Sequence, residues 1–264
     1  MKIEDLTLDN AREAIGLCIG STAGYEGAKR EKRRWLEKRL PDSAGGKLAY
    51  FDEQLAGILE YSLIEDAPFP VTGRDLLHIN CIWVLPRFQR REIGKTLINA
   101  CIQEAKSRGR KGLSVVSYDG VFLMPSTFFL HQGFKRTQIR GHDELMWKEV
   151  TPCNPPAFIH SGFQPKIDSR RVQVEILCSP QCPWSVITRQ RIEKVSHEFG
   201  RKVKVSSITM DDRRVVEKLG ESRKVFVNGN ESFPLAPTVD DIRKTLSTSS
   251  EELGFRPHIT HRAG

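Results

Sequence analysis

The segment at residues 76–98, LLHINCIWVLPRFQRREIGKTLI, constrains the fold of this chain more than any other. An apolar run rich in β-formers stops at Pro86, and a basic turn then leads into an amphipathic helix. Backbone N–H groups in the turn and in the first helical turn have no intrahelical acceptor, and they point outward with the positive end of the helix dipole. The segment therefore predicts a strand, a turn and a helix whose junction binds a pyrophosphate group.

The candidate donors of this junction lie between Gln89 and Thr96. Gly94 matters because a side chain at that position would keep an anion from approaching the backbone. The residues expected to bind the pyrophosphate are Gln89, Arg90, Arg91, Ile93, Gly94, Lys95 and Thr96. On the turn alone, an ordinary strand, basic turn and helix without a ligand stays an open alternative.

The turn resembles the phosphate-binding loop of the GNAT family of N-acetyltransferases, whose pattern is Gln or Arg, two residues, Gly, any residue, then Gly or Ala. The matching run here is Gln89, Arg90, Arg91, Glu92, Ile93 and Gly94. Glu92 stands where the family usually has its first Gly. The resemblance implies an enzyme that uses acetyl-CoA as cosubstrate. A carboxylate pointing at a pyrophosphate is unfavourable, and the neighbouring basic side chains could offset it.

The residues after the turn continue the resemblance. Apolar positions at helical spacing predict a helix over about residues 92–108, followed by a strand at 113–117 and a second helix at 124–131 that runs into Gly133 and Phe134. In the family, a Tyr four residues before this Gly-Phe pair can protonate the departing CoA thiolate. The matching residue is Phe129, which has no proton to give. Either water or another side chain protonates the thiolate, or the domain is catalytically slow.

The residues before the turn predict helices near 11–20 and 25–39 and strands near 46–52 and 55–64. With strands at 76–85 and 112–117, this order predicts a mixed α/β sheet flanked by helices on both faces. In GNAT enzymes the central strand splays from its neighbour and pairs with pantetheine. The resemblance assigns that role to Trp83, Val84 and Leu85. The charged helical segment from Lys29 is either a solvated face or, as in the family, part of the acceptor site.

Acetyl transfer needs a group that accepts a proton from the attacking amine, directly or through water. His78 lies on the strand that leads to the turn, and Glu60 lies on the preceding strand. We rank these two first as general base, ahead of Asn80, Glu65 and Asp66. Each of these residue types is also common as a surface or structural group, so both readings stay open.

Beyond about residue 150 the composition of the chain changes. Residues 150–170 are rich in proline and read as a linker or strap, and residues 171–248 then alternate strands and helices. This order resembles the thioredoxin-like fold, and glutaredoxins in particular, through the turn CPWS at Cys182–Ser185 and the strand VFVNG at Val225–Gly229. Ser185 replaces the family's resolving Cys, and Arg223 stands where its cis-proline would be.

Cys182 precedes Pro183, a residue suited to the first helical position, so we expect Cys182 at or next to the N-cap. A helix amino terminus favours thiolate and lowers the pKa of a thiol, which makes Cys182 a candidate reactive residue. Cys178 lies four residues earlier, and the pair could form a disulfide, ligate a soft metal or be structural. The cysteines without metal-ligand spacing, expected as free thiols, are Cys18, Cys81, Cys101 and Cys153. We predict no metal site.

The whole arrangement is similar to YoaP-like acetyltransferases, which also carry a QCP turn and a strand ending in NG. The predicted domains are a GNAT domain at 1–149, a linker at 150–170, a smaller thioredoxin-like α/β domain at 171–248 and a tail at 249–264.

The net charge of +8 is concentrated between Arg87 and Lys111, a stretch that contains eight basic residues and only two acidic ones. Such a patch could attract nucleic acid, but it coincides with the predicted CoA site and no nucleic-acid-binding motif accompanies it. The first ten residues lack the basic and apolar parts of a secretion signal, and no run is long enough to cross a membrane. We therefore expect a cytoplasmic protein with a small-molecule partner.

Two hypotheses follow. The first is an N-acetyltransferase in which the amine of an unidentified acceptor, a small-molecule amine or a thiol-bearing substrate, attacks acetyl-CoA directly. The second is a catalytically weak GNAT scaffold that carries a thiol-reactive or metal-binding module centred on Cys182.

Overall fold

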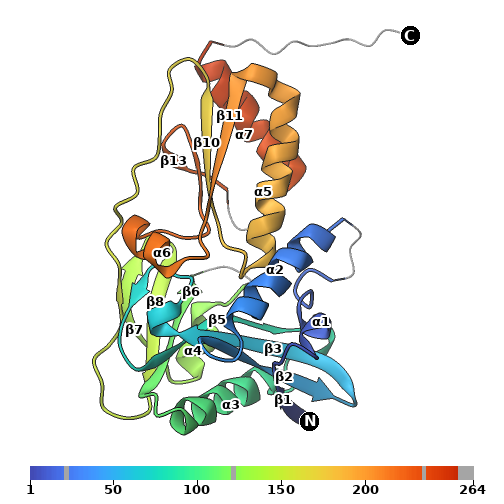
Figure 1. Ribbon diagram of the computed structural model, residues 1–264, viewed down its shortest axis with the longest axis vertical. Helices are drawn as coiled ribbons and strands as arrows, with labels where there is room; N and C mark the ends of the chain where they lie inside the picture. Colours follow the sequence, from blue (N-terminus) through green and yellow to red (C-terminus); the bar gives the residue numbers. More distant parts are fainter. Residues whose placement is uncertain (21–23, 120–122, 234–235, 255–264) are drawn as a thin grey trace.

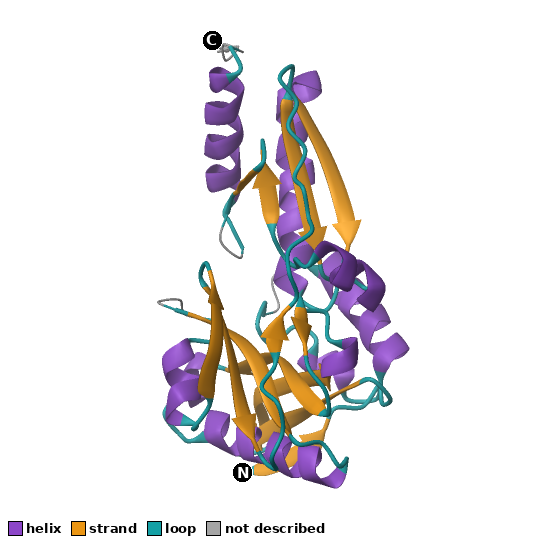
Figure 2. Cartoon of the chain, turned by 90° about the vertical axis from the view of Figure 1, so that its left-hand side faces the viewer, coloured by secondary structure: helices purple, strands orange, loops and turns teal. Residues whose placement is uncertain are grey.

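The structure is a computed structural model that describes residues 1–20, 24–119, 123–233 and 236–254. It contains a seven-stranded sheet and a four-stranded sheet, which lie one above the other along the long axis of the molecule (Figures 1 and 2). We call residues 1–149 the first region and residues 171–254 the second region. The two regions meet where their helices α2 (Glu26–Arg39) and α5 (Pro183–Ser196) pack together.

The first sheet has the strand order β1-β2-β3-β5-β6-β8-β7. Only β5 and β6 pair in parallel among its described strands, so the sheet is mixed. Its strands are β1 (Lys2–Asp5), β2 (Ala44–Phe51), β3 (Gln54–Leu63), β5 (Leu76–Val84), β6 (Gly112–Tyr118), β7 (Lys135–Arg140) and β8 (Asp143–Glu149).

Helices cover both faces of this sheet. On one face, α3 (Ile93–Ser107) and α4 (Ser126–His131) pack into an apolar cluster with Leu59, Tyr61 and Ile79. On the other face, α1 (Ala11–Ala14) and α2 pack against residues such as Leu48 and Ile58. This alternation follows from the period of two along a strand, which sends successive side chains to opposite faces. The predicted mixed sheet with flanking helices is confirmed.

The predicted elements agree with the observed ones within a few residues, but one predicted helix is much shorter than expected. The helix expected over 11–20 is regular only at Ala11–Ala14. The hairpin of β7 and β8 and the edge strand β1 were not predicted. The side chains of β7 are mostly exposed and polar, so its sequence lacks the apolar alternation that identifies a strand.

The second sheet has the order β11-β10-β12-β13, with β10 and β11 parallel and the other pairs antiparallel. One face carries α5 and α7 (Val239–Glu252), and the other carries α6 (Arg213–Leu219). Every residue of β10 is buried, as expected for a central strand with both faces covered. Its strands are β10 (Val172–Cys178), β11 (Val203–Thr209), β12 (Val225–Val227) and β13 (Asn230–Glu231).

Short elements join these parts. The segment between the two regions contributes β9 (Ala157–Phe158), which pairs with β4 (Val71–Thr72) of the first region. Three 3₁₀ turns are η1 (Ile64–Asp66), η2 (Pro86–Phe88) and η3 (His197–Lys202). Ile19 and Ala28 of the first region lie in the apolar cluster of the second, so the two regions share buried apolar contacts.

Candidate active site

The two central strands of the first sheet separate along their length. β5 and β6 pair from Leu76↔Gly112 to Ile79↔Val115. Beyond these residues β5 continues to Val84 and β6 to Tyr118, but the two strands no longer pair with each other. β3 stays paired with β5 as far as Gly57↔Val84. The backbone of β5 beyond Ile79 therefore has a ladder partner on one side and none on the other. In this stretch the carbonyl of Val84 also accepts a hydrogen bond from the Gln89 side chain at 3.2 Å.

The amino end of α3 lies just beyond this separation. Within the described residues, the backbone N–H groups of Arg90, Arg91 and Glu92 donate no hydrogen bond, and the first N–H groups of α3 have no acceptor by the geometry of a helix. The N–H groups at both ends of the predicted run are already paired, because Gln89 donates to the carbonyl of Pro86 at 3.2 Å and Thr96 donates to that of Glu92 at 2.9 Å. The unpaired donors therefore run only from Arg90 to Lys95, at one exposed turn.

The turn reaches this shape with two non-glycine residues in the left-handed region. Arg90 has φ of 61° and Glu92, the N-cap of α3, has φ of 58°. Glu92 stands where the resemblance expects Gly, which adopts this conformation at less cost. Its carboxylate is 75% exposed and pairs with Lys95 at 3.0 Å. The carboxylate therefore points to solvent rather than across the free N–H groups.

Gly94 brings α3 close to α4. A Cβ atom at Gly94 would lie 3.0 Å and 3.1 Å from two ring atoms of Phe128. Phe129 is fully buried, and its ring packs edge-to-face against Phe128 and Phe134, with centroids 5.1 Å and 5.4 Å away. Phe129 is thus part of the core beneath the turn, and its assignment as a cofactor contact stays a prediction.

His78 is fully buried on the face of the sheet opposite α3. Its Nδ1 atom lies 3.0 Å from the hydroxyl of Ser114, and its ring packs against Phe69 at 4.8 Å. Burial, together with the positive charges of Arg223 and Arg213, lowers the pKa of His78 to about 3. The imidazole is therefore neutral at physiological pH and a weak proton acceptor.

Glu60 lies in a buried ion pair that joins the two regions. Lys32 of α2 donates to the Glu60 carboxylate and also to the backbone carbonyl of Gln181 at 2.7 Å. The Gln181 side-chain amide donates to the same Glu60 oxygen at 2.9 Å. Lys32 also lies over the ring of Trp35 at 5.0 Å. All three polar side chains of this network are at least nine-tenths buried.

Cys182 is the N-cap of α5, as the sequence predicts, and Pro183 is the first helical residue. The thiol lies near two cysteines of the first region. Burial and the negative charge of a Cys182 thiolate raise the pKa of Cys18 to about 12, and burial with the charges of Cys18, Glu60 and Cys182 raises that of Cys81. All six cysteines are free thiols, so Cys178 and Cys182 form no disulfide. Burial raises the pKa of Cys178 to about 11.

These side chains form one largely buried cluster between the two regions, which we call the seam. It comprises Lys32, Glu60, His78, Asn80 and Cys81 of the first region, with Gln181, Cys182 and Arg223 of the second. Sequence reasoning identified His78, Glu60 and Cys182, and the fold brings all three to the seam. It did not single out Lys32, Gln181 or Arg223. Lys32 lies in a run of charged residues and cannot be distinguished from its neighbours by sequence. Arg223 could have been noticed, because it stands where the thioredoxin-like resemblance expects a proline.

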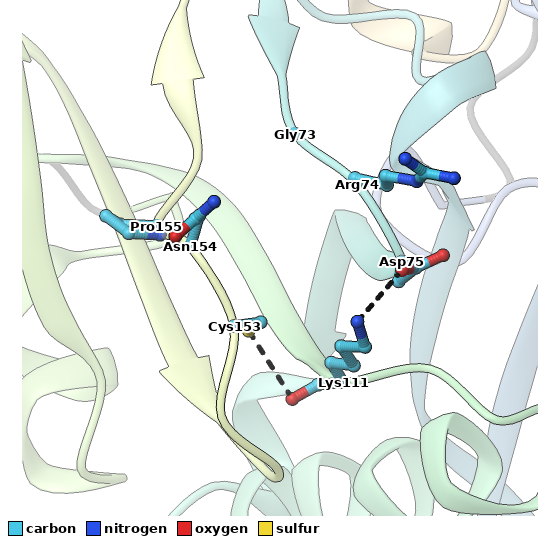
Figure 3. Close-up of a pocket in the computed structure, with 7 residues that line it drawn as sticks. All are labelled: Gly73, Arg74, Asp75, Lys111, Cys153, Asn154 and Pro155. Carbon is cyan, nitrogen blue, oxygen red and sulfur yellow. Dashed lines mark hydrogen bonds and ion pairs between the residues drawn. The ribbon is translucent and has the colours of Figure 1, made fainter.

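A separate cavity of about 340 Å³ opens at the other end of the strands, where β5 and β6 begin (Figure 3). Its lining includes Asp75 and Lys111, which form an ion pair at 3.3 Å, and the thiol of Cys153. None of the predicted site residues lines this cavity. Within the described part of the chain, no group of three or more His, Cys, Asp or Glu residues is placed to hold a metal ion.

Comparison with known proteins finds similarity to acetyltransferases. Residues 18–120 match the model of the family described as "Acetyltransferase (GNAT) family". Over 255 residues the chain is 27% identical to the "Uncharacterized N-acetyltransferase YoaP" of Bacillus subtilis (strain 168), covering 92% of this chain and 98% of that protein. The first region thus has a mixed α/β sheet flanked by helices and contains a segment similar to GNAT acetyltransferases, and these similarities support an N-acetyltransferase.

Solved structures also resemble part of the chain. PaiA N-acetyltransferase from Thermoplasma acidophilum, in complex with coenzyme A, is 19% identical with a TM-score of 0.43, covering 57% of this chain and all of its own. The ribosomal-protein-S18-alanine N-acetyltransferase from Escherichia coli is 15% identical with a TM-score of 0.41, covering 58% of this chain and 96% of its own.

In the described ranges, no helix has both the length and the apolar character needed to cross a bilayer.

Proposed function

We propose that the protein transfers an acetyl group from acetyl-CoA to the amine of an acceptor bound at the seam. The observation that carries this proposal is the separation of β5 from β6, which ends beside the unpaired N–H groups at the start of α3. One ligand with a diphosphate and an extended amide-containing arm would satisfy both sets of backbone groups. CoA has both parts.

The residues fit such a ligand. The turn and the first helical residues, from Arg90 to Lys95, would hold the pyrophosphate through their unpaired N–H groups, the helix dipole and the side chains of Arg90 and Arg91. Pantetheine would pair with the edge of β5 that faces away from β3, at the predicted residues Trp83, Val84 and Leu85. These assignments place the thioester near the middle of the sheet, beside the seam.

In the proposed reaction the amine attacks the thioester carbonyl, the C–N bond forms, and the C–S bond breaks to release the CoA thiolate. The amine must lose a proton, and Glu60 is the better candidate to accept it, directly or through water. Glu60 pairs with Lys32 at the seam, whereas His78 is a neutral imidazole whose low pKa makes it a poor base. Because Phe129 lacks a hydroxyl, water or another side chain protonates the thiolate.

The second region would present the acceptor. Its topology, with parallel β10 and β11 joined through α5 and the antiparallel pair of β12 and β13 followed by α7, supports the thioredoxin-like assignment. We keep the domain boundaries at 1–149, 150–170, 171–248 and 249–264. The cytoplasm stays the expected location.

Calorimetric titration of the folded protein with acetyl-CoA tests the cofactor assignment. We expect binding that weakens on Arg90→Ala and Arg91→Ala substitution but not on Arg170→Ala, a matched change at a side chain that is 88% exposed in the linker. Absence of binding at millimolar acetyl-CoA, with the protein folded, would contradict the proposed transferase.

The alternative is a thiol-reactive module on an inactive acetyltransferase fold. The position of Cys182 as a free thiol at the N-cap of a 14-residue helix favours it. Thiol alkylation of the wild type and Cys182→Ser as a function of pH tests this reading. A Cys182 pKa near the free value of about 8.5 would remove it.

A further inference from the structure

Arg223 lies at the seam without a carboxylate partner. Its guanidinium stacks 3.9 Å above the ring of Phe69 and donates to the hydroxyl of Tyr118 at 2.5 Å. Its other electrostatic neighbours are Cys81, Cys182 and Asp143, and it forms an ion pair with none of the described carboxylates. Lys224, the next residue, pairs with Glu221 at 3.2 Å and with Glu231 at 2.8 Å.

The fold holds this guanidinium in place. Arg223 has φ of 56°, in the left-handed region that non-glycine residues seldom adopt. The next residue accepts a hydrogen bond at its carbonyl from the N–H of Leu177, at 2.8 Å, which ties the loop to the end of β10. Phe69 in turn packs on His78 of β5. A strained backbone that fixes an unpaired charge beside a site is typical of a binding residue.

The same seam carries unpaired hydrogen-bond acceptors. Asn80 and Gln181 are both fully or almost fully buried. Their amide nitrogens donate to Ser62 at 2.7 Å and to Glu60 at 2.9 Å, while the oxygens Asn80 Oδ1 and Gln181 Oε1 have no partner among the described residues. Leaving a buried polar atom unpaired is costly, so such atoms indicate a ligand that supplies the missing donors.

The two kinds of group complement a ligand with charges of both signs. A guanidinium binds a carboxylate through two parallel hydrogen bonds. Amide and carboxylate oxygens accept the N–H bonds of an ammonium or amine. Arg223 stacks on Phe69, and Phe69 packs on His78 of β5. Two residues further along β5 lies Asn80, next to Cys81, whose register partner on β3 is Glu60. The cationic and the acceptor-rich parts therefore belong to one cluster.

We propose that the acceptor is an amino acid or a short peptide, whose carboxylate binds Arg223 while its amine faces Glu60, Asn80 and Gln181. This inference rests on the proposed function and names its substrate class. It also gives the second region a task, because Arg223 and Gln181 both belong to it. The second region would thus select substrates by charge.

The test compares free amino acids and dipeptides with their C-terminal amides, which keep the amine and lose the negative charge. CoA release is measured for each pair with the full chain. We expect kcat/KM to be at least about tenfold higher for the carboxylates, the effect of one lost charge-assisted contact. Arg223→Gln should remove that preference, mainly through KM, by lowering kcat/KM for the carboxylates much more than for the amides, and Arg223→Lys should restore part of it.

Lys224→Gln is the matched control, because it removes a positive charge from the same loop at a residue that is already paired. It should keep the preference for carboxylates. Equal turnover of acids and amides by the wild type would overturn the inference, as would an equal loss for both classes in a folded Arg223→Gln protein. A protein that binds acetyl-CoA but acetylates no member of the panel also overturns it. Absence of acetyl-CoA binding instead contradicts the proposed transferase itself.

Discussion

At the scale of single residues, the clearest departure from expectation is Glu92. The turn needs a left-handed residue at the N-cap of α3, and the chain meets this need with a charged side chain instead of glycine. The carboxylate is directed to Lys95 and solvent. The substitution thus carries a local conformational cost and places a negative charge near the proposed diphosphate site.

Glu92→Gly should therefore raise both stability and affinity. Relief of the left-handed strain should add about 1 kcal/mol to the free energy of unfolding. Removal of the charge should tighten acetyl-CoA binding about three- to fivefold at low salt, and less at high salt. Denaturant unfolding and calorimetry measure the two effects. Glu92→Gln separates them, because it removes only the charge, and a less stable Glu92→Gly protein would show that the strain argument is wrong.

His78 should make the protein sensitive to acid. Its pKa is about 3 in the folded chain, against an ordinary value of 6.5, so below pH 6.5 the unfolded chain binds a proton that the folded chain does not. Stability attributable to His78 is therefore complete above pH 6.5 and is lost as pH falls toward 3. The loss reaches about 2 kcal/mol at pH 5.

Chemical denaturation at pH 7.5 and pH 5 checks this prediction. The stability of His78→Gln should fall by about 2 kcal/mol less between the two pH values than that of the wild type. His142→Gln, at an exposed position, should follow the wild type. Parallel curves for the wild type and His78→Gln would mean that the buried imidazole does not titrate as described.

At the scale of elements, local sequence signals located most helices and strands. The long helices α2, α3, α5 and α7 were all predicted, and each is present. The hairpin of β7 and β8 was missed because β7 is solvated and identified only by its pairing with β8. The separation of β5 from β6 was available only through the family resemblance, since nothing local in a strand tells where its neighbour departs.

The start of α7 offers a test of how much one cap contributes. Thr238 and Asp241 form a reciprocal capping box, in which the Thr238 hydroxyl accepts from the Asp241 N–H at 3.1 Å and the Asp241 carboxylate accepts from the Thr238 N–H at 2.9 Å. Thr238→Ala should lower the free energy of unfolding by about 1 kcal/mol, whereas Thr238→Ser should nearly retain it. Equal stability of the two variants would contradict the capping argument.

At the scale of the whole molecule, the two regions are joined by polar contacts as well as apolar ones. Arg213 of α6 donates to the carbonyls of Ala67 and Phe69, both at 3.0 Å, and of Val71 at 2.7 Å. These contacts hold the second region against the segment that carries Phe69, and hence against the seam. Lys32, Glu60 and Gln181 form the second polar junction.

Arg213→Gln should weaken the contact between the two regions. Loss of several charge-assisted hydrogen bonds should cost at least about 2 kcal/mol and separate the unfolding of the two regions. Fluorescence of Trp184 and of the three tryptophans of the first region, each isolated by substitution to Phe, follows the transitions. Arg214→Gln, at a side chain that is 88% exposed, should leave one coincident transition. Coincident transitions in Arg213→Gln would contradict this role.

Glu60 has both a structural and a proposed chemical role, and a double variant separates them. Glu60→Gln leaves the buried Lys32 ammonium without its carboxylate and should cost about 3–5 kcal/mol. Adding Lys32→Met removes the stranded charge and should recover most of that stability. If Glu60 is the base, the double variant should still turn over acetyl-CoA at least about 100-fold more slowly. Wild-type turnover by the stable double variant would exclude Glu60 as the base.

By itself, the sequence determined the strand, turn and helix at residues 76–98, the helix that begins at Pro183 after the N-cap Cys182, and the alternation of elements in both regions. These features depend on residues close along the chain, whose spacing and capping chemistry can be recognised without a partner. The tertiary structure decided which charged and polar side chains contact each other. Lys32 reaches Gln181 across 149 positions and Gln181 reaches Glu60 across 121, because the packing of the two regions, and no local pattern, brings those side chains together.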